Sequence, residues 1–352
     1  MAKILLTGGL GFIGSHTAVE LIAGGHEVIL VDNLSNTRIE VLDGIETISG
    51  VRPIFEELDM ANQGDVDLLC SKYTFDGCIH FAAFKAVGES VAKPLEYYNN
   101  NIASLVYLLQ NFRDQGHNNI IFSSSCTVYG QADEMPITED APIKPAESPY
   151  GNTKQIGEEI IQEAIAAHPE LKAIALRYFN PIGAHESAII GELPLGVPMN
   201  LIPFITQTAA GIRKELKVFG NDYPTTDGTA VRDYIHVVDL AKAHVTALNR
   251  LMENKNSSNY EVFNIGTGMG SSVLKAINAF EKVSGEKLNW AFAPRRSGDV
   301  IEAYADTTKA NNTLGWKAEK NIEDCWYCGA VGGLRLDIDF PLPKVERKTG
   351  GF

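Results

Sequence analysis

Cations are scarce in this sequence. Its 352 residues include 30 lysines and arginines against 44 aspartates and glutamates, a net charge of −14. A chain without a basic surplus is a poor partner for nucleic acid, because neutralising a phosphate backbone needs a basic face. Long apolar runs are missing as well: none approaches the roughly 18 residues that a membrane helix requires, so we expect no membrane partner. The apolar fraction of 45% still suffices for a large buried core in one or two domains.

Cysteine is also scarce. Five cysteines are an odd number, which excludes a fully paired disulfide framework and favours the cytoplasm. Cys325 and Cys328 have the spacing of a redox or zinc motif, but no second pair accompanies them. His16 and His236 are flanked by apolar residues, and no cluster of histidines and carboxylates indicates a triad or a metal site. We therefore predict a cytoplasmic protein that holds no metal.

Short apolar runs alternate with amphipathic stretches over residues 1–180. Continuous apolar strands separated by helices are typical of a parallel sheet covered by helices on both faces. The sequence therefore predicts an α/β protein whose first domain, residues 1–180, is a Rossmann-type doubly wound parallel sheet. The expected strands cover 4–6, 28–31, 78–81, 120–122 and 173–176, and the expected helices cover 15–23, 101–112 and 150–167.

The pattern changes after residue 180. Residues 181–203 contain four prolines and three glycines, which indicate an irregular segment. We interpret residues 181–352 as a smaller mixed α/β substrate-binding lobe, with some of its chain returning to the first domain. Its expected helices cover 203–211, 238–253 and 272–284, its expected strands cover 216–219 and 262–265, and residues 329–352 are expected to be irregular.

A glycine-rich segment, residues 7–14, follows the first expected strand and opens the first expected helix. Glycines in this context give a tight turn, let a pyrophosphate approach the backbone and direct a helix amino terminus at the anion. Asp32 ends the second expected strand, where a carboxylate accepts hydrogen bonds from a ribose and repels a 2′-phosphate. The pattern favours a dinucleotide site that prefers NAD over NADP, with a merely flexible turn as the alternative.

Tyr150 and Lys154 are four residues apart, and Ser148 and Pro149 directly before them are typical of a helix start. On a helix the two side chains therefore share one face. A free tyrosine has a pKa of about 10 and is a poor base at neutral pH, but a nearby ammonium and a cationic nicotinamide ring both favour its phenolate. The same spacing also occurs on ordinary surface helices.

Three serines, Ser123, Ser124 and Ser125, follow the expected strand 120–122. Ligands of open α/β sheets bind beyond the carboxyl ends of the strands, so one of these hydroxyls is placed to bond a reacting hydroxyl group. Serines at such a position also cap turns, and Ser124 suits that role best.

These segments together resemble the extended short-chain dehydrogenase/reductase family and, within it, the branch of nucleotide-sugar 4-epimerases. The resemblance runs from Gly8 to about Trp326 and rests on TGGLGFIGSH at 7–16, DNLSN at 32–36, FAAFKAVGES at 81–90, SSSCTVYG at 123–130, RYFNP at 177–181 and VRDYIHV at 231–237. It implies that Ser125, Tyr150 and Lys154 are catalytic, with Tyr150 as acid/base and Lys154 tuning it. It also implies tightly held NAD, a homodimer, and interconversion of UDP-galactose and UDP-glucose through a 4-keto intermediate.

The binding residues come from the same resemblance. Those implied for NAD are Gly8, Gly11, Phe12, Ile13, Gly14, Asp32, Asn33, Asn36, Asp59, Met60, Phe81, Ala82, Lys85, Asn100, Ser123, Tyr150, Lys154 and Phe179. Those implied for the UDP-sugar substrate are Lys85, Ser125, Asn180, Asn200, Leu201, Phe219, Arg232, Tyr234, Arg296, Asp299 and Ala303. Arg232 and Arg296 suit the diphosphate because a guanidinium forms paired hydrogen bonds, and Arg295 is the alternative to Arg296. Phe219 suits ordinary core packing equally well.

Two further positions bear on the reaction. Relatives that dehydrate or decarboxylate nucleotide sugars carry carboxylates just after the active-site hydroxyl, whereas Cys126 and Thr127 stand there in this chain, which favours plain epimerisation. Ala303 occupies a position where a tyrosine would crowd an N-acetyl group, so we expect UDP-GalNAc and UDP-GlcNAc to be accepted as well. The alternatives are a 4-epimerase of another UDP-sugar (a uronate or a pentose), a net oxidoreductase, or a non-catalytic NAD-binding scaffold.

Overall fold

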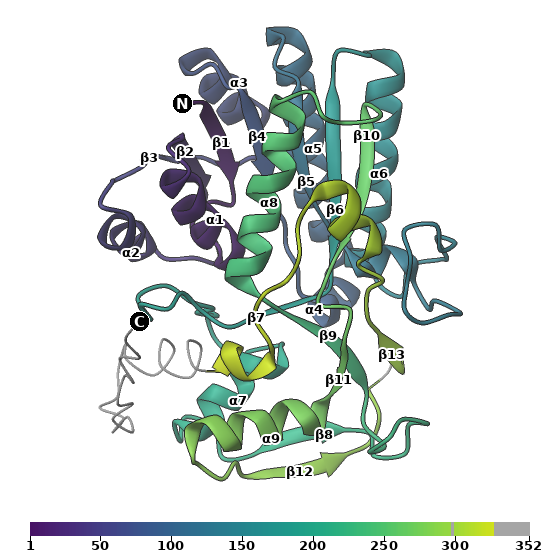
Figure 1. The fold of residues 1–352 in the computed structure, drawn as a ribbon. Coiled ribbons are helices and arrows are strands. Elements are labelled where there is room, and N and C mark those ends of the chain that lie inside the picture. The colour runs from purple at the N-terminus through teal and green to yellow at the C-terminus, as the bar shows by residue number, and fades with distance from the viewer. Residues whose placement is uncertain (297–298, 327–352) are drawn as a thin grey trace, which may run out of the picture.

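The computed structural model describes residues 1–296 and 299–326. Its main layer is a seven-stranded sheet in which every neighbouring pair is parallel (Figure 1). In spatial order the strands are β10 (Tyr260–Ile265), β6 (Lys172–Tyr178), β5 (Asn119–Ser125), β4 (Gly77–His80), β1 (Lys3–Thr7), β2 (Glu27–Asp32) and β3 (Ile54–Glu57). The predicted doubly wound parallel sheet is confirmed.

Both faces of this sheet are buried under helices. Alternate residues of β1 point to opposite faces, so Ile4 and Leu6 belong to one apolar cluster and Leu5 to the other. The first cluster includes α1 (Phe12–Ala23), α2 (Glu40–Ser49) and α8 (Val237–Met252). The second includes α3 (Gln63–Lys72), α5 (Pro94–Gln115) and α6 (Pro149–Ala167), while the short α4 (Val87–Ala92) precedes α5.

A smaller lobe lies below the carboxyl ends of the sheet in the view of Figure 1. Its first sheet joins β9 (Val231–His236) to β7 (Asn180–Ile182), β11 (Gly270–Ser272) and β13 (Glu302–Ala303). A second, two-stranded sheet pairs β8 (Leu216–Phe219) with β12 (Trp290–Ala293). The helices α7 (Leu201–Ala209) and α9 (Val273–Ser284) share an apolar core with β8 and Trp326. Because β7 follows β6 directly, the lobe is tied to the edge of the sheet where ligands of such folds bind.

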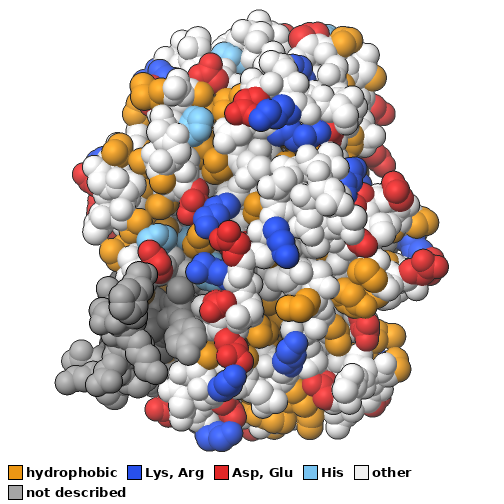
Figure 2. All heavy atoms as spheres, viewed as in Figure 1, with side chains coloured by type: hydrophobic (Ala, Val, Ile, Leu, Met, Phe, Trp, Pro, Cys, Tyr) orange, Lys and Arg blue, Asp and Glu red, His pale blue; other side chains and the backbone are white. Residues whose placement is uncertain are grey.

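Two further short elements lie in the described part of the chain. A 3₁₀ turn, η1 (Cys126–Tyr129), follows β5, and a π-helical turn, η2 (Ala310–Leu314), lies near the end of the described chain. Cys328 of the predicted Cys-x-x-Cys spacing and the segment 329–352, expected to be irregular, lie outside the described residues. On the face that Figure 2 shows, lysines and arginines are interspersed with aspartates and glutamates. None of the helices in the described part of the chain has the length and apolar character needed to cross a membrane.

Candidate active site

The glycine-rich turn connects β1 to α1. Gly8 has a φ of +67°, and a Cβ there would lie 2.9 Å from the main-chain nitrogen of Ala82. A Cβ on Gly14 would lie 2.3 Å from the carbonyl oxygen of Gly8, so neither position tolerates a side chain. Gly11 caps α1, and no side chain accepts from the first turn of the helix. Free amides at a helix amino terminus beside a close backbone approach fit a pyrophosphate.

Asp32 ends β2 directly beside this turn and is buried. One carboxylate oxygen accepts from the main-chain nitrogen of Leu10 at 3.2 Å, and the other accepts from Leu34 at 3.0 Å and from the Thr37 hydroxyl at 3.0 Å. Burial raises the pKa of Asp32, while these hydrogen bonds oppose the rise. The acid is therefore fixed beside the phosphate turn, which fits an adenosine ribose.

The other residues predicted to bind NAD follow the neighbouring strands. Asn33 and Asn36 follow β2, Asp59 and Met60 follow β3, and Phe81 and Ala82 follow β4. Lys85 lies near the start of α1, because its Nζ is 5.9 Å from the centre of the Phe12 ring. Asn100, on α5, donates to the side-chain oxygen of Asn101 at 3.0 Å, and Phe179 separates β6 from β7. The topology thus brings this set to the carboxyl ends of adjacent strands.

Ser125, Tyr150 and Lys154 converge at the carboxyl end of β5. Ser148 caps α6, as predicted, and its hydroxyl accepts from the nitrogen of Gly151 at 3.1 Å. Tyr150 and Lys154 occupy the first turns of that helix and are both buried. The Lys154 Nζ donates to the carbonyl oxygen of Ser123 at 2.6 Å, and the Ser125 hydroxyl is hydrogen-bonded to the Tyr150 phenol.

Burial dominates the electrostatics of this group. It raises the pKa of the Tyr150 phenol well above its ordinary value, and Tyr178 adds to the rise, while the hydrogen bond from Ser125 opposes it. Burial also lowers the pKa of Lys154 to about 8, against the opposing effect of Glu158. A tyrosine in this setting becomes a base only when positive charge stands beside it. Lys154 supplies one such charge.

One expectation about the serines was wrong. Ser125, rather than Ser124, is the turn cap: its hydroxyl accepts from the nitrogen of Thr127 at 3.2 Å at the start of η1. Ser124 instead points into the core and donates to the carboxylate of Glu158. Successive residues of a strand face opposite sides, so Ser123 and Ser125 share the other side. Ser123 there hydrogen-bonds the hydroxyl of Tyr178.

The residues predicted to bind substrate come from the smaller lobe and its loops. Asp299 lies between two arginines, 3.7 Å from a guanidinium nitrogen of Arg232 and 3.8 Å from one of Arg296. The Arg296 guanidinium also lies 4.6 Å from the centre of the Phe219 ring. Phe219 is 36% exposed, which argues against a place in the core. Arg295 turns away to an exposed ion pair with Asp222.

The rest of this set surrounds the same region. Ala303 pairs in register with Arg232 across β13 and β9, is buried, and belongs to the apolar cluster that contains Phe179. Asn180 pairs with Tyr234 across β7 and β9. Asn200 and Leu201 stand at the start of α7. The side chain of Asn200 donates to Glu192 at 3.0 Å, and Lys85 forms an ion pair with the same carboxylate.

Neither histidine considered in the sequence analysis is an available base. Burial lowers the pKa of His16 to about 3 and that of His236 to about 4. His236 caps α8 through Nδ1, which accepts from Val238 at 3.1 Å. Among the described residues, no group of histidines, cysteines or acids is arranged to hold a metal ion.

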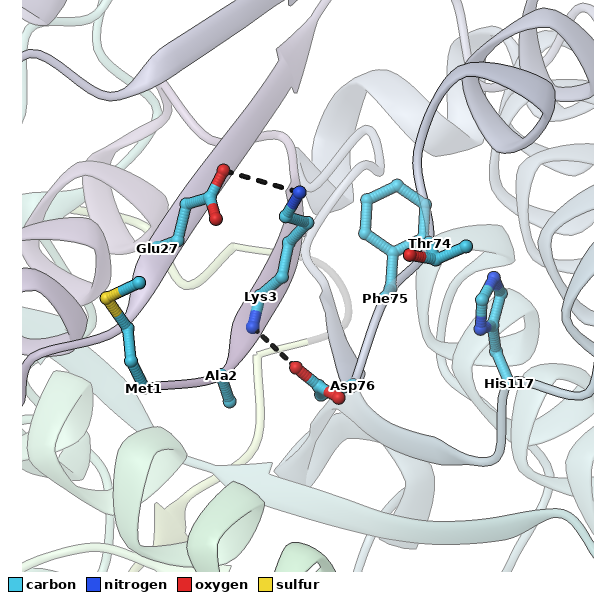
Figure 3. A pocket seen from close by; sticks show the side chains of 8 residues that line it. All are labelled: Met1, Ala2, Lys3, Glu27, Thr74, Phe75, Asp76 and His117. Atoms are coloured by element: carbon cyan, nitrogen blue, oxygen red, sulfur yellow. Dashed lines mark hydrogen bonds and ion pairs between the residues drawn. The ribbon is translucent and has the colours of Figure 1, made fainter.

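A shallow cavity elsewhere on the molecule is unrelated to this site. Its lining includes Lys3 and Glu27, which begin β1 and β2, and Asp76, which precedes β4 (Figure 3). These are amino ends of strands, whereas the candidate site lies at the carboxyl ends. The side chains around the cavity already pair with one another, since Lys3 Nζ contacts Glu27 at 3.4 Å. His117 borders the cavity beside Phe75.

Sequence reasoning missed several residues of the site region. Glu158 and Glu192 sit in segments that carry no motif, yet each carboxylate contacts side chains of the candidate site or its supports. Thr37 is a third, since it donates to Asp32. Only Glu158 left a signal, because it stands four residues after Lys154 on an expected helix.

The fold and this grouping of side chains define an extended short-chain dehydrogenase/reductase. The GDP-mannose 4,6 dehydratase family matches residues 5–327. The UDP-glucose 4-epimerase of Bacillus subtilis is 49% identical over 338 residues, covering 94% of this chain and 98% of that protein. UDP-glucose 4-epimerase 2 of Arabidopsis thaliana is 50% identical over 328 residues, covering 92% and 93%.

Solved structures give the same result. UDP-glucose 4-epimerase from Bifidobacterium longum, in complex with NAD+ and UDP, is 44% identical with a TM-score of 0.90 and covers 95% of this chain and 98% of that one. The enzyme from Stenotrophomonas maltophila, with bound NAD and formylated UDP-arabinopyranose, is also 44% identical with a TM-score of 0.91, covering 95% and 98%. The chain belongs to the family of UDP-glucose 4-epimerases.

Proposed function

We propose that the protein is an NAD-dependent UDP-glucose 4-epimerase that interconverts UDP-galactose and UDP-glucose. The observation that carries the proposal is the convergence of Ser125, Tyr150 and Lys154 at the carboxyl end of β5, on the same edge of the sheet as the glycine turn that follows β1. Family membership supports it, and so do the two solved structures of relatives, which hold NAD together with UDP in one and with formylated UDP-arabinopyranose in the other. Bound NAD would accept hydride from C4 of the sugar and return it to the opposite face.

The chain's own residues would do the proton chemistry. Tyr150 takes the proton of the C4 hydroxyl, directly or through Ser125, and gives it back after the 4-keto sugar has turned over. Lys154 favours the phenolate by its charge and holds the nicotinamide ribose. Because no net oxidation occurs, the site must retain the reduced cofactor and keep out water. Burial of Tyr150 and Lys154 supports that requirement.

The residues of the two parts of the chain suit different ligands. We assign NAD to residues 1–180 and the UDP-sugar to residues 181–352, with β10 and α8 returning to the first sheet. Arg232 and Arg296 supply the local positive charge that a diphosphate needs on an acidic protein. Their shared partner Asp299 holds both guanidinium groups at the same place.

Substrate breadth depends on Ala303. Its methyl group lies in a buried apolar cluster with Phe179, and a small side chain there leaves room for an N-acetyl group on the sugar. We therefore propose that UDP-GalNAc and UDP-GlcNAc are also interconverted. The pentose alternative also has support, because a relative from Pisum sativum that is 46% identical is named a bifunctional UDP-glucose and UDP-xylose 4-epimerase.

A homodimer fits two adjacent helices of the sheet domain. Partly exposed apolar side chains Ile102 and Val106 lie on α5, and Ile156 lies on α6. The amide of Asn152 donates to the Tyr98 hydroxyl at 2.7 Å, which places these two stripes side by side. A partly exposed apolar stripe of this kind suits a second copy of the chain. The scarcity of cysteine supports a cytoplasmic location.

The experiment is to incubate the purified protein with UDP-galactose and no added NAD. Formation of UDP-glucose with NAD still bound to the protein is the expected result. Stoichiometric release of NADH would identify a net oxidoreductase instead. Turnover of a UDP-pentose or UDP-uronate alone would identify the other epimerase, and retention of NAD without any turnover would identify a scaffold.

A further inference from the structure

Glu158 connects the helix of the acid/base pair to three strands. It stands one turn after Lys154 on α6 and is 4% exposed. Its carboxylate accepts from Ser124 on β5, from Arg177 Nε and Nη2 on β6 at 2.9 and 2.6 Å, and from the Tyr260 hydroxyl on β10 at 3.1 Å. These three strands are neighbours in the sheet. One buried carboxylate therefore accepts hydrogen bonds from three adjacent strands of the sheet.

We propose that Glu158 is a positioning residue for the acid/base pair: its carboxylate fixes α6 against β5, β6 and β10 and places a negative charge one helical turn from Lys154. This inference rests on the proposed function of Tyr150 and Lys154. It assigns Glu158 no contact with substrate or cofactor. It acts only through the helix it anchors and the charge it places beside Lys154.

The surroundings of the pair contain few other charges. Burial lowers the pKa of His80, on β4, to about 3, so this neighbour of Lys154 is neutral. Burial raises the pKa of Tyr129, Tyr178 and Cys126 to about 12 each and raises that of Tyr150 and Tyr260 as well. Besides Lys154, Arg177 and Glu158, the carboxyl group of Glu139 acts on Tyr129, and burial raises the pKa of Glu139. The charge of Arg177 is compensated by Glu158, with which it forms a bidentate ion pair.

The direction of the effect follows from these charges. Burial pulls the pKa of Lys154 down to about 8, and Glu158 holds it up. Without the carboxylate, nothing would oppose this effect of burial on the Lys154 pKa, and Lys154 would lose its proton at a lower pH. The phenolate of Tyr150 would then lose its supporting charge. Activity should consequently decline at a lower pH on the alkaline side of the profile.

Two variants separate the effect of the charge of Glu158 from the effect of its side-chain length. Glu158→Gln removes the charge and Glu158→Asp keeps it but shortens the side chain. The matched control is Glu261→Gln, because Glu261 on β10 forms the same two-pronged buried pair with Arg250, at 2.7 and 2.9 Å, and lies off α6. For each protein, kcat and KM for UDP-galactose are measured from pH 5.5 to 10, together with Tm.

We expect Glu158→Gln to move the alkaline decline about one unit lower and to reduce kcat about tenfold near pH 8.5, with KM within about twofold. Glu158→Asp should leave the decline in place but lower kcat, because the shorter carboxylate reaches its donors poorly. Glu261→Gln should lower Tm and leave the profile unchanged.

An alkaline decline in Glu158→Gln that coincides with that of the wild type and of Glu261→Gln would overturn the inference. If Glu158→Gln does not fold, Glu158→Asp decides, since a kcat equal to that of the wild type would exclude the anchoring role. Wild-type protein that converts no UDP-galactose would overturn the proposed function and this inference with it. An active wild type with unshifted variants would overturn this inference alone.

Discussion

The Lys154 ammonium lies 5.9 Å from the centre of the Tyr150 ring, one turn along the same helix. The two groups are buried together, so the charge acts on the phenol through a medium that screens poorly. At the same time the ammonium is held by the carbonyl of Ser123, which prevents it from turning to solvent. The positive charge is therefore held beside the phenol, as the acid/base role proposed for Tyr150 requires.

Tyr150→Phe removes the phenolic oxygen and leaves the shape of the ring. We expect kcat to fall by about 10²–10⁴-fold, because general acid/base groups contribute on this scale. The change should leave NAD bound, as judged from the cofactor released on denaturing the purified protein. Turnover close to that of the wild type would exclude Tyr150 as the base.

Lys154→Met removes the charge that favours the phenolate. The pKa of Tyr150 is already raised by burial and would rise further, so activity should appear only at higher pH than in the wild type. The measurement is kcat as a function of pH with UDP-galactose. An acidic limb at the same pH in both proteins would contradict the tuning role.

Asp32→Ala removes the carboxylate proposed for the adenosine ribose. Losing hydrogen bonds to a charged group costs about 1.5–3 kcal/mol, so NAD should bind about 10–100-fold more weakly and be lost during purification. The repulsion of a 2′-phosphate disappears too, and added NADP should support some turnover. The control is Glu57→Ala, an exposed acid at the end of the adjacent β3, which should retain NAD.

Ala303→Tyr tests the substrate breadth. The ring would crowd an N-acetyl group on the sugar, so turnover of UDP-GlcNAc should fall below detection while that of UDP-galactose persists within about tenfold. Kinetics on both substrates, with wild-type protein in parallel, measure this. Wild-type protein that turns over UDP-galactose but not UDP-GlcNAc would remove the proposal without any variant.

Val106→Glu places a charge in the stripe proposed for the dimer. Sedimentation should show a dimer for the wild type and a shift to monomer for the variant, because a buried unpaired charge at an interface is costly. Leu68→Glu is the control, since Leu68 on α3 is 57% exposed and lies off that stripe. A monomeric wild type at micromolar concentration would refute the dimer.

Much of the fold was readable from hydrophobic patterns, and the failures have physical causes. The strands over 28–31 and 120–122 are buried on both faces and therefore appear as continuous apolar runs. In contrast, β3 is a short edge strand whose sequence, Ile54–Glu57, is half acidic and half-exposed, so it resembles a loop. The helix expected over 101–112 begins earlier, at Pro94. The hydrophobic pattern did not indicate this start because the polar residues before 101 face partly outward.

The site was predictable where backbone chemistry dictates the residue. A glycine is required at position 14 because any Cβ would meet Gly8, and such a constraint leaves a motif. The hydrogen-bond partner of a buried side chain leaves no motif in the sequence, since it depends on which strands become neighbours. Ser124 was therefore misassigned: its bond to Glu158 joins residues 34 positions apart, and nothing local indicates it.

The strand β10 comes from residues 260–265, yet it completes a sheet whose other six strands end by residue 178. During synthesis, β6 remains an open edge with unpaired main-chain groups until about 80 further residues have been made. A fragment stopped at residue 180 would carry that edge permanently and tend to self-associate. We therefore expect the folding of the part of the chain that holds the glycine turn to depend on the chain that follows it.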